Sequence, residues 1–466
     1  MSTQKINGKM TAGKVSFLIL FALIVQNLGA QDKILSIEDA VQLTLSSDPR
    51  MQSAHWDYLS SLGKLEEARL RQLPSLSVSA GYTRLSDLQS KISLGPVNMV
   101  IDSLDNSFSF AANMQYPVFA GFRVRESIKL AAIQSSGKEI SLDMMKSAIE
   151  FETRRAYWEA VRSIYNVGML QENLSLMENN LNIVKQQLAQ GTAINADLLS
   201  SQMRRDQADI DLGNAKTIQQ KAFLNLASLV SDSEDSASLK DPVSIYNLGT
   251  KPDAVPEMAA PSQPLSGTID TDALINSALL HRPEIKAAAL SVSAAEHSKR
   301  LAEAPLYPTL NLTGNYTYAD PNQRVYFQSD PKAFTGTWAL GASLSWDLGG
   351  IPANVSELKV QDNGIQKSLS DSSRQKDLIL LDVRNSILSY DQTRRDSGLV
   401  TLMLDQAKEN ERVMKERYSA GTASANDLLG ASLARLRSEF TITNKQIDLQ
   451  IAASDLCRAA ALSGEK

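Results

Sequence analysis

One short stretch occurs twice in this chain of 466 residues, and it limits the possible folds more than any other feature. The first copy spans residues 188–199, and the second spans residues 418–429, which lie 230 positions later. In each copy a Gly-Thr pair interrupts a long segment that lacks proline and has apolar residues at helical spacing. A repeat of about half the chain length predicts one architecture built twice, rather than several unrelated domains.

Each Gly-Thr pair predicts the tip of a helical hairpin. Glycine at the end of a helix adopts a left-handed conformation that other residues resist, and the threonine after it can cap the next helix. Asp197 and Asp427 then fall in the first turns of the returning helices, where a carboxylate favours the helix dipole. The predicted tip residues are Gly191, Thr192, Gly421 and Thr422.

Residues 1–30 have the pattern of a removable export signal. Three lysines lie before and at the start of an apolar run at 15–25, and small residues end at Ala30. A membrane anchor is the weaker alternative, because this run is too short to span a bilayer. Without the signal lysines the formal net charge changes from -5 to -8, which disfavours nucleic acid as a partner. The single cysteine, Cys457, excludes an internal disulfide and is predicted to be a small packed side chain.

The predicted order of elements is the same in both halves. The first repeat, residues 31–230, has short helices at 36–46 and 49–72, two strands, a long helix at 121–190 and a returning helix at 193–229. The second repeat, residues 271–466, follows the same plan, and the proline-rich residues 231–270 are predicted to form a partly structured linker. Spacings of four and three predict a coiled-coil seam in each long helix. The seam positions are Leu170, Leu174, Met177, Leu181, Val184 and Leu188, and then Val400, Leu404, Ala407, Glu411, Met414 and Tyr418.

Two pairs of segments alternate with a period of two and predict strands with one apolar face. They run over residues 76–82, 108–118, 310–318 and 338–348, and a polar loop joins each pair, at 84–106 in the first half. Each segment is about as long as a strand that crosses a membrane. Four strands cannot close a barrel, and lipid cannot satisfy an open sheet edge. The sequence therefore predicts that several copies associate in order to insert.

The tandem plan of helix, two strands, long helix, Gly-Thr tip and returning helix resembles the TolC-like outer-membrane efflux proteins. The local matches are Tyr116-Pro-Val-Phe-Ala-Gly121 and Trp346-Asp-Leu-Gly-Gly350 at the strand-to-helix junctions, and Tyr418-Ser-Ala-Gly421-Thr422 at the second tip. The resemblance covers nearly all of the chain after residue 30. It implies a mainly α fold with a membrane β-barrel. In this fold a homotrimer forms an α-barrel from long helical hairpins and a twelve-stranded barrel from four strands per chain, and residues 231–270 belong to an equatorial region.

This resemblance also implies a function, a location and partners. The family serves as the exit duct of tripartite efflux or type I secretion systems, in the cell outer membrane and the periplasm. The implied partners are a periplasmic adaptor that docks on the tips, an inner-membrane transporter and outer-membrane lipid. Tyr418 stands at the position of the family's gate tyrosine, and Asp197 and Asp427 stand at those of aspartates near the periplasmic constriction. The chain departs from the pattern at Ala423, where some members carry a gate arginine, and at Gly430, where some carry a second aspartate.

The sequence predicts no catalytic, cofactor or metal site. The chain has three histidines, at positions 55, 281 and 297, and none has the spacing of paired metal ligands. An alternative to the channel is a structural coiled-coil protein of the envelope, but such a scaffold has no need for amphipathic strands of membrane length.

For two sets of residues, the sequence allows two interpretations of their role. Asp197 and Asp427 either supply helix-terminal charge or form a ring of carboxylates around a narrow bore, and the two are compatible. The strand aromatics either belong to the core of a soluble sandwich or form membrane-interface girdles, which are favoured. These aromatics are Tyr82, Phe108, Tyr116, Tyr316, Tyr318, Trp338 and Trp346.

Overall fold

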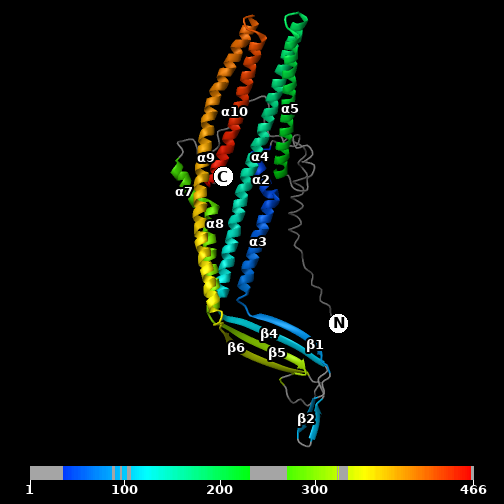
Figure 1. Ribbon diagram of the computed structural model, residues 1–466, viewed down its shortest axis with the longest axis vertical. Helices are drawn as coiled ribbons and strands as arrows, with labels where there is room; N and C mark the ends of the chain where they lie inside the picture. The colour runs from blue at the N-terminus through cyan, green and yellow to red at the C-terminus, as the bar shows by residue number, and fades with distance from the viewer. Residues whose placement is uncertain are drawn as a thin grey trace, which may run out of the picture. The chain divides into compact units, whose positions relative to one another are not determined.

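The computed structural model describes residues 35–86, 90–94, 97–101, 106–230, 270–322, 324 and 334–462 (Figure 1). The predicted export signal and residues 231–269 of the predicted linker lie outside these residues. The chain divides into two compact units, and each draws on both halves of the sequence. The first unit is Met1–Asp48, Ala148–Thr268 and Ser386–Leu456, and the second is Pro49–Ser147, Ile269–Asn385 and Cys457–Lys466.

Two long helices contribute residues to both units. Helix α4 (Arg123–Ala189) has 67 residues and α9 (Ile351–Ser419) has 69, so each is about 100 Å long at 1.5 Å per residue. No helix in the described part of the chain is both long and apolar enough to cross a membrane.

The first unit contains α2 (Ile37–Ser47), α5 (Asn195–Val230), most of α10 (Ala425–Ala459) and the portions of α4 and α9 that lead to the Gly-Thr pairs. The apolar core packs Ala160 and Val161 of α4 against Phe223 and Leu226 of α5 and Ile447 of α10. Closer to the tips the two hairpins use matching positions. Leu212 packs with Leu170 and Leu174 in the first, and Ile442 packs with Val400 and Leu404 in the second. The predicted seam therefore closes both hairpins at the same offset of 230.

The second unit contains the helices α3 (Pro49–Leu70), α7 (Thr271–His281) and α8 (Pro283–Glu303), followed by η1 (Ala304–Leu306). Lys138 of α4 binds Asp57 of α3 at 2.7 Å, and Lys299 of α8 binds Asp362 of α9 at the same distance. Glu126 of α4 is buried and contacts the Nδ1 atom of His297 on α8 at 2.6 Å. Ion pairs thus fasten α3 to α4 and α8 to α9.

A sheet in the second unit has the order β1-β4-β5-β6, with every neighbouring pair antiparallel. Its strands are β1 (Ser75–Arg84), β4 (Asn106–Ala120), β5 (Thr309–Asp320) and β6 (Thr335–Ser345). Strands from both halves of the sequence therefore share one sheet, and β1 and β6 are its edges (Figure 1).

Two details of the strand prediction are wrong. The predicted polar loop at 84–106 contains two antiparallel strands, β2 (Ser90–Leu94) and β3 (Val97–Ile101), because the runs on either side of Gly95-Pro96 contain β-prone residues. Strand β6 ends at Ser345, so Trp346 and Leu348 lie beyond it. The Asp347 carboxylate accepts the Gly350 N–H at 3.1 Å and forms the turn that ends the alternation.

Candidate functional site: the two helical tips and the sheet

The two tips have the same backbone conformation. Gly191 has φ +75° and Gly421 has φ +74°, so both adopt the predicted left-handed conformation. The Gly191 N–H donates to the carbonyl of Leu188 at 3.0 Å, and the Thr192 N–H donates to that of Gln187 at 2.9 Å. This is the Schellman arrangement, and the same pair of bonds closes the second tip.

Thr192 and Thr422 do not cap the returning helices, so that prediction is wrong. Their hydroxyls donate back to the carbonyls of Gln187 and Arg417, at 3.0 and 3.1 Å. The Schellman turn holds each threonine against the helix that has just ended. The next helix begins three residues later, which places its cap at residue 194 or 424.

The two caps differ in chemistry. Ser424 and Asp427 form a reciprocal capping box, in which the Ser424 N–H donates to the Asp427 carboxylate at 2.9 Å and the Asp427 N–H donates to the Ser424 hydroxyl at 3.2 Å. The hydroxyl also donates to that carboxylate, at 2.7 Å. The side-chain and backbone hydrogen bonds from Ser424 hold the pKa of Asp427 below its usual value. At the first tip Ile194 donates its N–H to Asp197 at 3.0 Å but has no hydroxyl to return the bond.

Tyr418, Asp197 and Asp427 are all exposed in the single chain. Among the described residues, no hydrogen bond joins the Tyr418 side chain to either aspartate. The structure places all three close in sequence to the tip turns, on the last turn of α9 and the first turns of α5 and α10.

Arg435 is a central residue of the first unit that the sequence did not single out. Its guanidinium, on α10, binds Glu439 one turn along at 2.6 Å, Glu411 of α9 at 2.7 Å, and Glu172 of α4. The side chain is only 17% exposed. Burial opposes its charge, but the hydrogen bonds to Glu172 and Glu439 prevail and raise the pKa of Arg435 above its usual value. Arg435 therefore joins the second hairpin to the first.

A repeat signal could have identified this residue. Arg205 lies eight positions after Asp197, as Arg435 lies eight positions after Asp427. Arg205 is 37% exposed, and its nearest carboxylates, at 3.0 to 3.9 Å, are Asp206, Asp209 and Glu178. All of these partners belong to the first hairpin, so Arg205 does not join the two hairpins.

The sheet has one apolar and one neutral polar face. Side chains on the apolar face include Val78 on β1, Phe110 on β4, Tyr318 on β5 and Leu340 on β6, and all four are exposed. Along the opposite face the Asn315 amide donates to the Asn113 side-chain oxygen at 2.5 Å, across β5 and β4. The remaining residues of that face are mainly serine, threonine and other small or amide side chains.

The predicted aromatics lie on the apolar face or at its end. The rings of Tyr82 and Phe108 contact each other in a tilted arrangement, with their centroids 4.8 Å apart. Tyr316 and Trp338 are opposite each other in the strand register. Tyr318 stacks on Phe334, a partner that the sequence reading missed. Towards the helix ends, Tyr116 lies on β4, and the Trp346 indole N–H donates to the Leu306 carbonyl at 3.2 Å. A further cluster of Phe119, Phe122 and Tyr307 at this junction was also missed.

In the part of the chain that the structure describes, no group of histidine, cysteine, aspartate or glutamate side chains is arranged to hold a metal ion. The features described above that bear on function are the tips, Arg435 and the amphipathic sheet.

Solved structures share this fold over most of the chain. The CmeC outer membrane channel of Campylobacter jejuni matches with a TM-score of 0.73 over 99% of this chain and 93% of that one, at 15% identity. The outer membrane protein VceC of Vibrio cholerae matches with a TM-score of 0.71 over 92% of this chain and 97% of that one, at 18% identity. The class of fold is therefore that of the TolC-like outer-membrane channels, as predicted.

Sequence comparison then identifies the family. The family model described as outer membrane efflux protein matches residues 40–231 and 274–462, so the chain belongs to that family. The pyoverdine export outer membrane protein OpmQ of Pseudomonas aeruginosa is 27% identical over 212 residues, which are 43% of this chain and 42% of that relative's length. The predicted location in the outer membrane is confirmed, and the family and fold are those of channels rather than enzymes.

Proposed function

We propose that the protein is the exit duct of a tripartite efflux or type I secretion system. Three copies form a continuous conduit across the periplasm and the outer membrane. The partners are a periplasmic adaptor and an inner-membrane transporter, and outer-membrane lipid surrounds the strands. Family membership supports the efflux role, and the amphipathic sheet is the observation that carries the proposal.

The sheet supports insertion as an oligomer. Its apolar face exposes aromatic and aliphatic side chains, which suits contact with hydrocarbon. Its edge strands, β1 and β6, have one paired side each, and an unpaired strand edge is costly in lipid. Four strands from each of three copies would pair β1 of one copy with β6 of the next and remove every edge.

The tips support two proposed roles. Gly191, Thr192, Gly421 and Thr422 form narrow turns with open space around the glycines, which would let a helical hairpin of the adaptor approach closely. Asp197, Asp427 and Tyr418 would form the periplasmic constriction, with three copies of each carboxylate around the bore. The aromatics of the apolar face would lie at the two membrane interfaces.

A structural role in the envelope is the second candidate. It accounts for the long helices but leaves the exposed apolar face of the sheet without a purpose, so the conduit is favoured.

Native mass measurement in detergent and conductance in planar bilayers test the proposal together. We expect a mass of three chains and discrete channel openings. A stable monomer that inserts into lipid would refute the trimer, and trimers without conductance would favour the structural role.

A further inference from the structure

An aromatic cluster at the junction between the sheet and α4 extends the apolar face of the sheet. The ring centroids of Phe119 and Phe122 are 5.3 Å apart, and that of Tyr307 lies 5.7 Å from Phe122 and 6.5 Å from Phe119. A register shift between Pro117 and Phe119 makes Phe119 the strand partner of Leu310, on the apolar face. Phe122 and Tyr307 are exposed. The exposed apolar surface therefore continues to the point where the strands end.

The backbone at Phe122 is strained. Phe122 has φ +66°, in the left-handed region that residues other than glycine rarely adopt. It follows Gly121, which also has a positive φ and where a Cβ atom would collide with the Ala304 carbonyl. The close approach at Gly121 requires glycine, but glycine would also relieve the strain at Phe122. A ring kept in this conformation and exposed to solvent points to a function for the ring.

Two arginines follow the cluster in the first turn of α4. Arg123 and Arg125 are both exposed, and the Arg125 side chain is 68% exposed. The Arg125 Nε atom lies 3.8 Å from the Glu126 carboxylate, which His297 and Lys129 contact more closely, at 2.6 and 3.0 Å. Among the residues that the structure describes, no carboxylate forms an ion pair with Arg123. Both guanidinium groups can therefore bind an anion from outside the chain.

We propose that these five residues, the aromatic–basic patch, bind a phospholipid of the periplasmic leaflet. This inference rests on the proposed insertion of the sheet in the outer membrane. The patch lies where the strands give way to the helices, which is where the proposed conduit leaves the hydrocarbon on the periplasmic side. The rings of Phe119, Phe122 and Tyr307 would pack on the acyl chains near the headgroup. Arg123 and Arg125 would donate charge-assisted hydrogen bonds to the phosphate.

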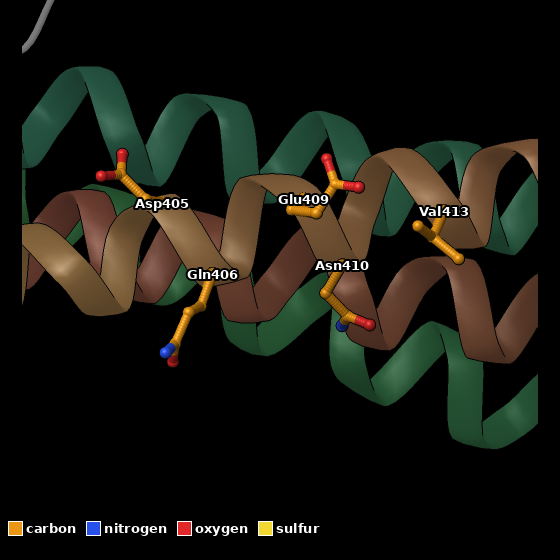
Figure 2. Close-up of a pocket in the computed structure, with 5 residues that line it drawn as sticks. All are labelled: Asp405, Gln406, Glu409, Asn410 and Val413. Atoms are coloured by element: carbon orange, nitrogen blue, oxygen red, sulfur yellow. The ribbon is translucent and has the colours of Figure 1, made fainter.

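The charge of the patch distinguishes it from a hollowed surface on α9. Figure 2 shows this shallow groove, which is lined by Asp405, Gln406, Glu409, Asn410 and Val413. The two carboxylates of the groove would repel a phosphate. The patch instead places positive charge beside aromatic rings, which suits the headgroup of a phospholipid at the membrane surface.

Native mass measurement of the trimer with added lipid tests the inference. The wild-type trimer should tightly retain one phosphatidylglycerol per chain and should not retain diacylglycerol, which lacks the phosphate. Arg123→Gln with Arg125→Gln should weaken the retention of phosphatidylglycerol by about tenfold or more, because two charge-assisted contacts are lost. The matched control is Arg204→Gln, an exposed arginine on α5 that should leave lipid binding unchanged. Equal loss in the control, or equal retention of diacylglycerol, would overturn the inference.

Phe122 provides a variant that separates lipid binding from folding. Phe122→Gly removes the ring but suits the left-handed backbone, so the trimer should remain folded and should lose most of the retained phosphatidylglycerol. Phe122→Trp should keep the lipid. Wild-type retention in the glycine variant would show that the ring does not contact the lipid, against the proposal.

These outcomes also separate the lipid site from the proposed function. A conducting trimer that retains no phospholipid at the patch would overturn the lipid site and leave the conduit standing. A single chain that binds phosphatidylglycerol through Arg123 and Arg125 would support the lipid site and overturn the proposed trimer.

Discussion

The two helical hairpins share a backbone plan and differ in the side chains that fix it. Both tips have a left-handed glycine and an aspartate that accepts the N–H of the cap residue. Only the second tip returns that bond, through Ser424. Arg435 of the second hairpin reaches the first hairpin, whereas its counterpart Arg205 binds carboxylates of its own hairpin. The two copies therefore share a tip conformation and differ in the capping bond and in the contacts of this equivalent arginine pair. We expect the second hairpin to carry the latch and the first to be comparatively fixed.

The tip glycines should show the largest effect. Replacing Gly191 and Gly421 with leucine should abolish export, because a side chain at the turn would block close approach of an adaptor hairpin and the left-handed backbone resists a Cβ atom. Trimers should persist, since a Cβ atom added at either glycine would meet no other atom of the described chain, its sequence neighbours aside, within 4 Å. Export assays and native mass check both points. Gly398→Leu, an open position within α9, is the matched control, and unchanged export in the tip variant would count against tip docking.

Substitutions of Arg435 and Arg205 test whether these equivalent arginines contribute unequally to the stability of the helical region. Arg435→Ala should destabilise the helical region by about 3 kcal/mol, because it leaves Glu172, Glu411 and Glu439 without their shared cation. Arg205→Ala should change little, since its carboxylate partners are mostly exposed. Thermal loss of the helical circular dichroism signal measures both. Similar losses from the two substitutions would mean that Arg435 has no special role.

The proposed constriction should show a moderate effect on conduction. Tyr418→Phe should raise single-channel conductance, because it removes the phenolic hydrogen bond that Tyr418 would make across the constriction of the closed trimer and that Leu188 of the first hairpin cannot make. Asp197→Ala with Asp427→Ala should reduce cation preference and block by divalent or trivalent cations. Planar bilayers measure both properties, with Asp211→Ala, a half-buried carboxylate further along α5, as the control. If the double variant keeps wild-type selectivity, the carboxylates serve only as helix-terminal charge.

The caps should show the smallest effect. Ser424→Ala should lower the melting temperature at neutral pH, and Ile194→Ser should raise it by completing the box at the first tip. The pKa of Asp427 is lowered in the folded chain, so its contribution is present above the unfolded pKa and is lost as pH falls through the folded value. The decrease in melting temperature caused by Ser424→Ala should therefore become smaller at acidic pH. A decrease in melting temperature that does not depend on pH would show that the Ser424 hydroxyl stabilises the helix independently of the Asp427 carboxylate.

Much of the fold follows from interactions between residues close in sequence, and these can be predicted from the sequence alone. Proline-free segments with a seam pattern become the long helices α4 and α9 because helical bonding and the seam are local and periodic. The left-handed glycines follow from the cost of a Cβ atom in that conformation. The strands of the larger sheet follow from alternation, whereas β2 and β3 were missed because Gly and Pro between two short runs indicate a loop as readily as a strand pair.

Only the tertiary structure decided which residues meet across the chain. Ser424, and not Thr422, caps α10. The Schellman turn places the Thr422 hydroxyl against the preceding helix, where it donates to the Arg417 carbonyl instead of capping the next helix as predicted. The contact of Arg435 with Glu172 joins residues 263 positions apart, and no local pattern specifies such a pair. The same holds for the exposure of Leu199 where its counterpart Leu429 is buried. The sequence determined the repeated elements, because their energetics are local, and the packing of one hairpin on the other decided which repeated positions are covered and which remain open.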